Sequence, residues 1–329
     1  MNSRTNLVVA VLLAAACAAP LVLTNPAQQN FVILVLMIAQ LGVAWNVLGG
    51  YVGQVSLGHA AFFGIGAYTS SVLLIQYGAS PWIGMIAGGV VAMVFALLIG
   101  WPCFRLKGHY FAIATIAVAE IVQVVFANWD LVGGAVGLYI PLQKQGLKAF
   151  VFNTSKLPYY YIALALLIIT LLTSWIMEKS FLGHYFRAIK DEPEAARSLG
   201  VNLTHYKLVA IAASSFLTAA GGTLYAQKEL FIDPGSVMAT SLSVKIALVS
   251  ILGGVGSLFG PVIGAGILTG IEETTRQFFG GSGRGTDLIL YGLIIIIVAV
   301  YYPDGVVGAI KTWRERRRAA RLPRDGSGK

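Results

Sequence analysis

The chain has 329 residues, of which 57% are hydrophobic and only 11% are charged. A soluble globular domain carries roughly 25% charged residues, so this composition excludes an ordinary soluble protein. No Lys, Arg, Asp or Glu occurs between Arg4 and Arg105, and a soluble surface of that length cannot be built without them. The apolar runs 31–43 and 85–99 lack the polar alternation of a transmembrane β-barrel. The sequence therefore predicts an all-α integral membrane protein, a polytopic helical bundle.

Apolar runs of about 20 residues, the length that a helix needs to cross a bilayer, predict about ten membrane spans. The first run could instead be a cleaved signal peptide, but its length favours a retained span. The eighth and ninth runs share a short glycine-rich turn and form either two full spans or one re-entrant hairpin. The spans are expected at 5–23, 30–49, 54–75, 82–101, 109–128, 159–177, 207–227, 241–256, 259–277 and 286–303.

The distribution of basic residues predicts the orientation of these spans. With both termini in the cytoplasm, 16 of the 23 Lys and Arg residues fall in cytoplasmic segments, as the positive-inside rule requires. We expect one transmembrane domain over residues 1–305, with a cytoplasmic loop at 178–206, followed by a basic and partly disordered tail at 306–329. The net charge of +9 comes largely from this tail, which favours contact with anionic membrane lipid over a nucleic-acid partner.

Two glycine clusters, at 49–53 and 253–256, predict breaks in membrane helices. Non-helical backbone at membrane depth is tolerated only where it lines a cavity or is buried in protein. Broken helices in transporters also present free amide groups to anionic parts of a substrate. We therefore take the following residues as candidates for a substrate pathway: Gly50, Gly53, Gln54, Gly253 and Gly254.

A few polar residues lie inside predicted spans. Glu120 is near the middle of span 109–128, where an acidic side chain carries a high free-energy cost, and it is therefore a candidate for the substrate pathway. Alternatively, neighbouring polar groups only form hydrogen bonds with its carboxylate. Lys245 either reaches the membrane surface or pairs with an acid. His59 is expected to be a hydrogen-bonded packing residue, and the Gly84–Gly88 pair predicts close helix packing. The two cysteines and four histidines suggest no metal site.

The loop at 178–206 contains a short predicted helix near 191–200. Pro193 suits a first helical turn, and Gly200 supplies a left-handed stop. A helix of two turns is marginal alone and needs a surface to dock on.

Within this helix, Glu194-Ala195-Ala196 followed by Gly200 resembles the E-A-A-x-x-x-G loop of ABC importer permeases. The longer form of that motif ends in an apolar-Pro pair, whereas no proline occurs here between Pro193 and Pro234. Three further segments resemble the branched-chain amino acid permease family, and the likeness is greater to the longer of its two paralogous permeases. These segments are NVLGGYVGQVSLGHAAFFGIGAY (46–68), KGHYFA (107–112) and ILGGVGSLFGP (251–261).

The resemblance implies a transport subunit of the bacterial inner membrane, without catalytic residues or a bound cofactor of its own. It implies four kinds of partner: a second paralogous permease, two cytoplasmic ATPases, a periplasmic binding protein and membrane lipid. ATP and Mg²⁺ would bind to the ATPases, since this sequence has no G-x-x-x-x-G-K-[ST] phosphate loop. The residues that would couple to the ATPases are Glu194, Ala195, Ala196, Arg197 and Gly200.

Other readings remain open at this point. Related permeases carry urea, short amides or other amino acids. An ion-coupled secondary carrier would usually show several intramembrane acids, and Glu120 is nearly alone in this sequence. A membrane enzyme would need a visible constellation of catalytic residues.

Overall fold

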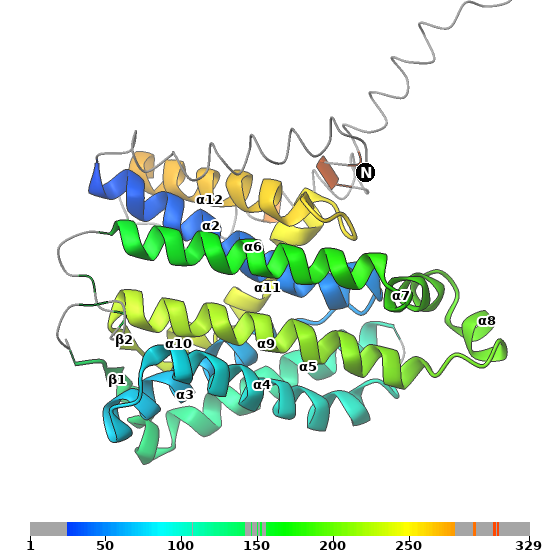
Figure 1. Cartoon of the computed structure of the whole chain (residues 1–329), viewed down its shortest axis with the longest axis horizontal. Helices are drawn as coiled ribbons and strands as arrows, with labels where there is room; N and C mark the ends of the chain where they lie inside the picture. The colour runs from blue at the N-terminus through cyan, green and yellow to red at the C-terminus, as the bar shows by residue number, and fades with distance from the viewer. Residues whose placement is uncertain are drawn as a thin grey trace, which may run out of the picture.

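The computed structural model describes residues 25–279 apart from 107, 142–145, 147–149, 151 and 153–155, together with 292, 293, 305, 306 and 308. Over these residues the chain is a bundle of long, roughly parallel helices (Figure 1). The longer helices are α2 (Pro26–Asn46), α3 (His59–Tyr77), α4 (Pro81–Cys103), α5 (His109–Ala127), α6 (Leu157–Lys179), α9 (Leu203–Glu229), α11 (Thr240–Gly253) and α12 (Gly260–Phe279). The shorter elements are η1 (Val47–Tyr51), η2 (Asp130–Val132), η3 (Gly134–Val136), β1 (Leu138–Tyr139), α7 (Phe181–Asp191), α8 (Pro193–Ser198), β2 (Phe231–Ile232) and α10 (Pro234–Val237).

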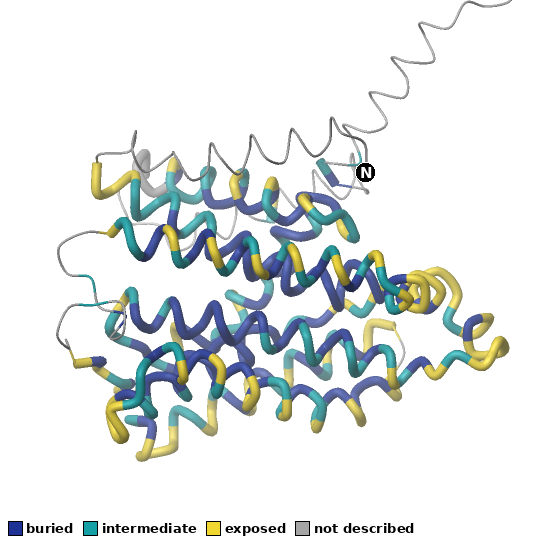
Figure 2. Tube along the Cα trace, in the orientation of Figure 1, coloured by how far each residue is buried: buried dark blue, intermediate teal, exposed yellow. Residues whose placement is uncertain are grey.

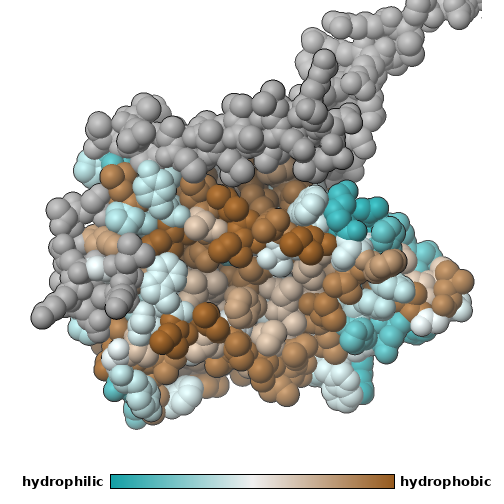
Figure 3. Space-filling model, in the orientation of Figure 1, coloured by the Kyte–Doolittle hydropathy of each residue, from teal (hydrophilic) through white to brown (hydrophobic). Residues whose placement is uncertain are grey.

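Seven helical segments of the described chain are long and apolar enough to cross a membrane. They confirm a polytopic helical membrane protein. An apolar band covers the middle of the bundle, and hydrophilic side chains gather at the end that carries α7 and α8 (Figure 3). The predicted span 5–23 and nearly all of the predicted span 286–303 lie outside the described residues, so the total of ten spans stays a prediction.

The bundle has two distinct ends (Figure 1). At one end, which we call the α8 end, α7 and α8 project beyond the long helices. At the other, the β end, β1 and β2 pair antiparallel, with Leu138 opposite Ile232 and Tyr139 opposite Phe231. This small sheet joins the segment after α5 to the end of α9.

The hairpin of α11 and α12 runs between these two ends. α10 follows β2 directly, whereas the turn after Gly253 lies beside Lys190 of α7. The segment Pro234–Gly253 has the length and apolarity of a membrane span, and α12 returns beside α2. The choice between two spans and a re-entrant hairpin stays a prediction, because α12 is not among the seven candidate segments.

Small residues bring the central helices α3, α4 and α9 into close contact. A Cβ atom on Gly222 of α9 would lie 2.0 Å from the carbonyl oxygen of Phe63, and one on Gly66 would lie 2.2 Å from that of Ala219. Gly84 of α4 likewise meets Ser70 of α3. The packing role expected for Gly84 and Gly88 is thereby confirmed. The buried lengths of α3 and α9 form the centre of the bundle (Figure 2).

The predicted span 54–75 is wrong at its start, because α3 begins only at His59. The preceding helix is interrupted where the glycine cluster predicted a break. After α2 the chain forms the π-helical turn η1, and Gly53 follows with a φ of 75°. Residues 52–58 lie outside the helices, although Gln54 N still donates to the carbonyl of Leu48 at 3.1 Å. The bundle supplies partners instead, since the indole of Trp45 donates to the carbonyl of Ser56 at 2.7 Å and Leu57 N donates to the hydroxyl of Thr115 at 3.0 Å.

His59 completes this arrangement as the packing residue that the sequence predicted. It is fully buried. Its Nε2 lies 2.8 Å from Oγ of Ser214, and that hydroxyl donates to the carbonyl of Ala44 at 2.7 Å. The imidazole therefore joins α3 to α9, and through Ser214 to α2.

The close contact of α3 and α9 predicts that Gly222→Ala destabilises the folded chain. The added methyl group meets backbone atoms of Phe63 that cannot turn away, so the cost should reach about 3 kcal/mol, the upper range for overpacking. Thermal unfolding of the detergent-solubilised chain measures this loss. The matched control is Gly266→Ala in α12, where no described atom lies within 4 Å of the new Cβ. An equal effect of the two substitutions would contradict the close-contact account.

Candidate functional site

The α8 end carries the short helix that the sequence predicted. α8 has six residues, begins with Pro193 and is followed by Gly200 with a φ of 85°. It is held by α7, an amphipathic helix that buries Gly183, Phe186 and Ile189 against the bundle. The proline fixes the first turn and the glycine permits the left-handed turn that leads into α9.

The five coupling candidates do not all face outward. Glu194, Ala195, Arg197 and Gly200 are exposed, and Arg197 lies 3.6 Å from Glu194 as an exposed ion pair. Ala196 is only 3% exposed and packs within its own chain. The face of α8 that is free to meet another molecule therefore excludes Ala196.

Leu199 is a candidate that the sequence reasoning missed. Its side chain is 86% exposed immediately after α8, at the tip of the α8 end. An apolar side chain so exposed outside the apolar band is a candidate anchor for a partner. The only signal in the sequence was its place just before Gly200, which does not distinguish an exposed leucine from a buried one.

The two predicted helix breaks lie side by side. Asn46, at the end of α2, is fully buried and makes two hydrogen bonds to the turn after α11. Its Oδ1 accepts from Gly256 N at 2.8 Å, and its Nδ2 donates to the carbonyl of Ser257 at 3.0 Å. Nothing in the sequence pattern indicated that the two glycine clusters meet, and the sequence analysis assigned no role to Asn46.

Both breaks are placed at the α8 end rather than halfway along the bundle. The carbonyl of Gly50 accepts a hydrogen bond from Lys190 Nζ at 2.9 Å, and Gly53 packs on the same lysine side chain. Gly253 closes against Gly260, and Gly254 has a φ of 123°. Gln54 is half-buried in the segment that follows Gly53. The assignment of these five residues to a substrate pathway stays a prediction. Their position restricts it to the end of the pathway nearest α8.

Charged side chains instead mark the middle of the bundle on one outer face. Glu120 is exposed near the middle of α5 and accepts a hydrogen bond from the hydroxyl of Thr240 at the start of α11. Lys245, farther along α11, forms an ion pair with Glu272 of α12. Of the two alternatives left open for Lys245, the structure shows the pairing with an acid. We call the side chains of Glu120, Thr240, Ser241, Lys245 and Glu272 the polar strip.

Exposure of the polar strip to hydrocarbon is unfavourable, because a charged side chain at the bilayer centre costs several kcal/mol of free energy. Ser241 is exposed and Lys245 and Glu272 are only half-buried. Within the described residues, the face of α5, α11 and α12 is thus the surface that needs water or another protein against it.

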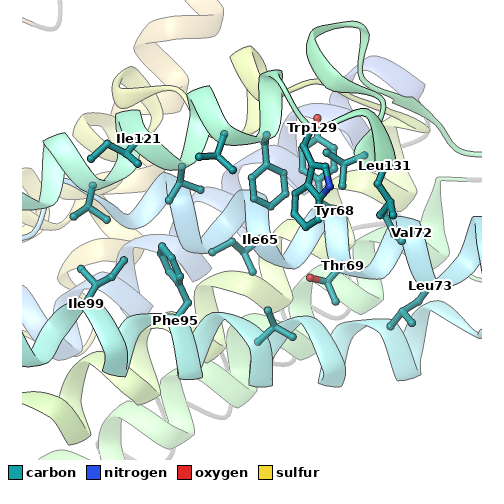
Figure 4. A pocket seen from close by; sticks show the side chains of 16 residues that line it. Ile65, Tyr68, Thr69, Val72, Leu73, Phe95, Ile99, Ile121, Trp129 and Leu131 are labelled. Atoms are coloured by element: carbon teal, nitrogen blue, oxygen red, sulfur yellow. The ribbon is translucent and has the colours of Figure 1, made fainter.

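A groove elsewhere on the bundle has the opposite character to the polar strip. A groove of about 620 Å³ lies between α3, α4 and α5 (Figure 4). Ile65, Phe95 and Ile99 project into it, and its lining includes no charged residue. This groove suits hydrocarbon, and its lining offers no charged side chain to a charged or zwitterionic solute.

Span-length helices, with hydrophilic side chains gathered at the α8 end, define a multi-pass membrane protein. A family model described as "Branched-chain amino acid transport system / permease component" matches residues 27–299. The chain belongs to this permease family.

Relatives place the chain more closely within the family. The high-affinity branched-chain amino acid transport system permease protein LivM of Escherichia coli is 29% identical over 290 residues, which cover 81% of this chain and 67% of LivM. LivH of the same bacterium, also a permease of that system, is 23% identical over 289 residues, 82% of this chain and 91% of LivH. The fructose import permease protein FrcC of Rhizobium meliloti is 22% identical over 314 residues, 84% of this chain and 85% of FrcC. The matched parts are almost equal in length but cover a smaller share of LivM than of LivH, so LivM is the longer of the two permeases. This chain has the higher identity to LivM.

Proposed function

We propose that this chain is a transmembrane permease subunit of a binding-protein-dependent ABC importer, which translocates leucine, isoleucine and valine across a bacterial inner membrane. The observation that carries the proposal is the family match over residues 27–299, together with the greater similarity to LivM than to LivH. A second permease, a LivH-like paralogue, completes the pathway. A periplasmic binding protein delivers the amino acid.

The α8 end is the cytoplasmic end in this proposal. Basic residues gather there on the loop after α4 and on the segment from α6 to α8, as the positive-inside rule requires of a cytoplasmic face: Arg105, Lys179, Arg187, Lys190 and Arg197. α8 docks on one of two ATPase subunits, which bind ATP and Mg²⁺ and hydrolyse the nucleotide. The docking face consists of Glu194, Ala195, Arg197 and Leu199, and Gly200 shapes the turn behind it.

The substrate passes along the face that carries the polar strip, between this chain and the second permease. A branched-chain amino acid is a zwitterion with an apolar side chain, so its path must offer charge to its ends and apolar surface to its middle. The exposed carboxylate of Glu120 is matched to the substrate ammonium. Val124, exposed on α5 one helical turn after Glu120, offers apolar surface beside this carboxylate.

Uptake by the reconstituted complex of this chain with its paralogue, ATPases and binding protein tests the function directly. We expect ATP-dependent accumulation of labelled leucine in proteoliposomes, and unlabelled isoleucine and valine should compete with it. Labelled urea should not accumulate. ATP-dependent uptake of urea but not of leucine would assign the chain to the amide-transporting branch instead.

Exposure of Leu199 predicts that Leu199→Glu weakens the docking of the ATPases. The new carboxylate must lose its hydration in the docked state, so the amount of ATPase that copurifies with the tagged chain should fall about tenfold or more. Val136→Glu is the control, because Val136 is 75% exposed and ends η3, just before β1 at the β end of the bundle. Undiminished copurification with the Leu199 variant would remove Leu199 from the docking face.

The role of Glu120 predicts that Glu120→Gln slows leucine uptake about tenfold while the complex still assembles. The amide keeps the size and the bond to Thr240 but loses the charge-assisted interaction with an ammonium group. Rates at several leucine concentrations measure the effect, and Glu120→Asp should retain part of the uptake. The control is Glu229→Gln, at the end of α9 near the β sheet. Wild-type uptake by Glu120→Gln would exclude Glu120 from substrate contact.

A further inference from the structure

Lys190 connects the loop that bears α8 to both helix breaks. It is the second-last residue of α7, and its Nζ donates to the carbonyl of Gly50, 140 residues away in sequence, at 2.9 Å. A Cβ atom on Gly53 would lie 3.1 Å from Lys190 Cγ, and one on Gly256 would lie 3.2 Å from Lys190 Nζ. The lysine thus lies between two glycines whose missing side chains leave room for it.

The carbonyl that Lys190 binds belongs to the last turn of a broken helix. η1 ends at Tyr51, so the carbonyl of Gly50 has no following helical amide to accept from. Helix C-terminal carbonyls carry partial negative charge, and a lysine ammonium near them forms a charge-assisted hydrogen bond. Lys190 therefore supplies, from α7, the donor that the interrupted helix lacks.

The same carbonyl lies against the turn between α11 and α12. A Cβ atom on Gly256 would be 3.2 Å from the Gly50 oxygen, and Gly256 N is held by buried Asn46 at 2.8 Å. The contacts are continuous, from α8 through α7 and Lys190 to the Gly50 carbonyl, and from there to the turn. The helices that leave this turn carry Thr240, Lys245 and Glu272 of the polar strip.

Another lysine of the α8 end does not share these contacts. Lys179, at the end of α6, has a side chain that is 60% exposed, and its Nζ lies 4.0 Å from the neighbouring Glu178. A lysine retained only for its positive charge would resemble Lys179. Lys190 instead reaches across to backbone of a different helix.

We propose that Lys190 is a positioning residue that transmits the movement of α8 to the α11–α12 hairpin, and so to the polar strip. The proposal rests on the proposed docking of α8 on an ATPase. When the ATPases shift α8, α7 moves with it, and Lys190 moves the Gly50 carbonyl and the turn at Gly256 together. Without the ammonium group the ATPases still dock, but their movement no longer reaches α11 and α12.

The test compares three variants in the reconstituted complex: Lys190→Met, Lys190→Arg and the matched control Lys179→Met. The measured quantity is leucine taken up per ATP hydrolysed. Lys190→Met keeps the length of the side chain but removes the charged donor, and should lower this ratio about tenfold. Lys190→Arg should restore most of it, and Lys179→Met should match the wild type. A wild-type ratio in Lys190→Met would overturn the proposal, as would an equal loss in Lys179→Met.

A second measurement separates this proposal from the proposed function. Hydrogen exchange at the amide of Gly256, measured on the full chain in detergent, reports on the turn without any ATPase or substrate. Exchange should be faster in Lys190→Met than in the wild type or in Lys179→Met. If the wild-type complex takes up no leucine, the proposed function fails while this exchange difference still supports the contact between Lys190 and the turn. Unchanged exchange in Lys190→Met would overturn that contact.

Discussion

The whole bundle depends on satisfying the backbone between α2 and α3. Residues 52–58 lie outside the helices, and Val52, Ser56 and Gly58 of this segment are buried, so their amide and carbonyl groups need hydrogen-bond partners within the protein. Each unsatisfied group would cost several kcal/mol. The side chains that bond this segment and the start of α3 come from four different helices: Trp45 of α2, Thr115 of α5, Ser214 of α9 and Ser243 of α11. The break is consequently the point about which these helices are fixed relative to one another.

Close helix packing makes this arrangement possible. Gly66 and Gly222 allow α3 and α9 to approach backbone to backbone, and the buried polar groups of α9 then come within reach of the break. Lipid supplies no hydrophobic force to press helices together, so contact of this kind has to come from shape and from hydrogen bonds. The glycines allow the helices to approach closely, and the buried polar side chains then form hydrogen bonds between them.

Charge is segregated by the same fold. The groove between α3, α4 and α5 is lined without charge, whereas the face of α5, α11 and α12 carries an acid and an ion pair near its middle. One outer surface of the chain is therefore suited to lipid tails and another is not. A permease that works beside a second permease needs this asymmetry, because the path for a zwitterion must be kept apart from the lipid.

The position of the helix breaks connects this face with the α8 end. Both breaks meet at Asn46 and Lys190, so the distance from the exposed tip to the α11–α12 hairpin is spanned by a few direct contacts. Claims of coupling between distant sites require an element that both sites can bias. In the proposed coupling the turn at Gly256 is this element, since Lys190 of α7 lies on one side of it and α11 and α12 leave from the other.

The sequence by itself determined the membrane class, most of the described helices, both helix breaks and the short helix after Pro193. These features depend on local properties: long apolar runs, glycine clusters, and a proline and a glycine that begin and end a helix. The resemblance in 46–68, 107–112 and 251–261 determined the family in the same way, because a motif is read residue by residue. Glu120 was recognised as unusual because an acid in an apolar run is visible without a structure.

Only the tertiary structure decided which of these residues meet. The start of α3 was misplaced by five residues because tertiary hydrogen bonds, not local preference, replace the helix over 54–58. Ala196 proved to be buried and Leu199 exposed, since the direction of a side chain on so short a helix depends on how α7 docks. The pairing of Lys245 with Glu272 and the meeting of Asn46, Gly50, Lys190 and Gly256 join residues far apart in the chain. Such contacts depend on the packing of whole helices, and no pattern within one segment of sequence records them.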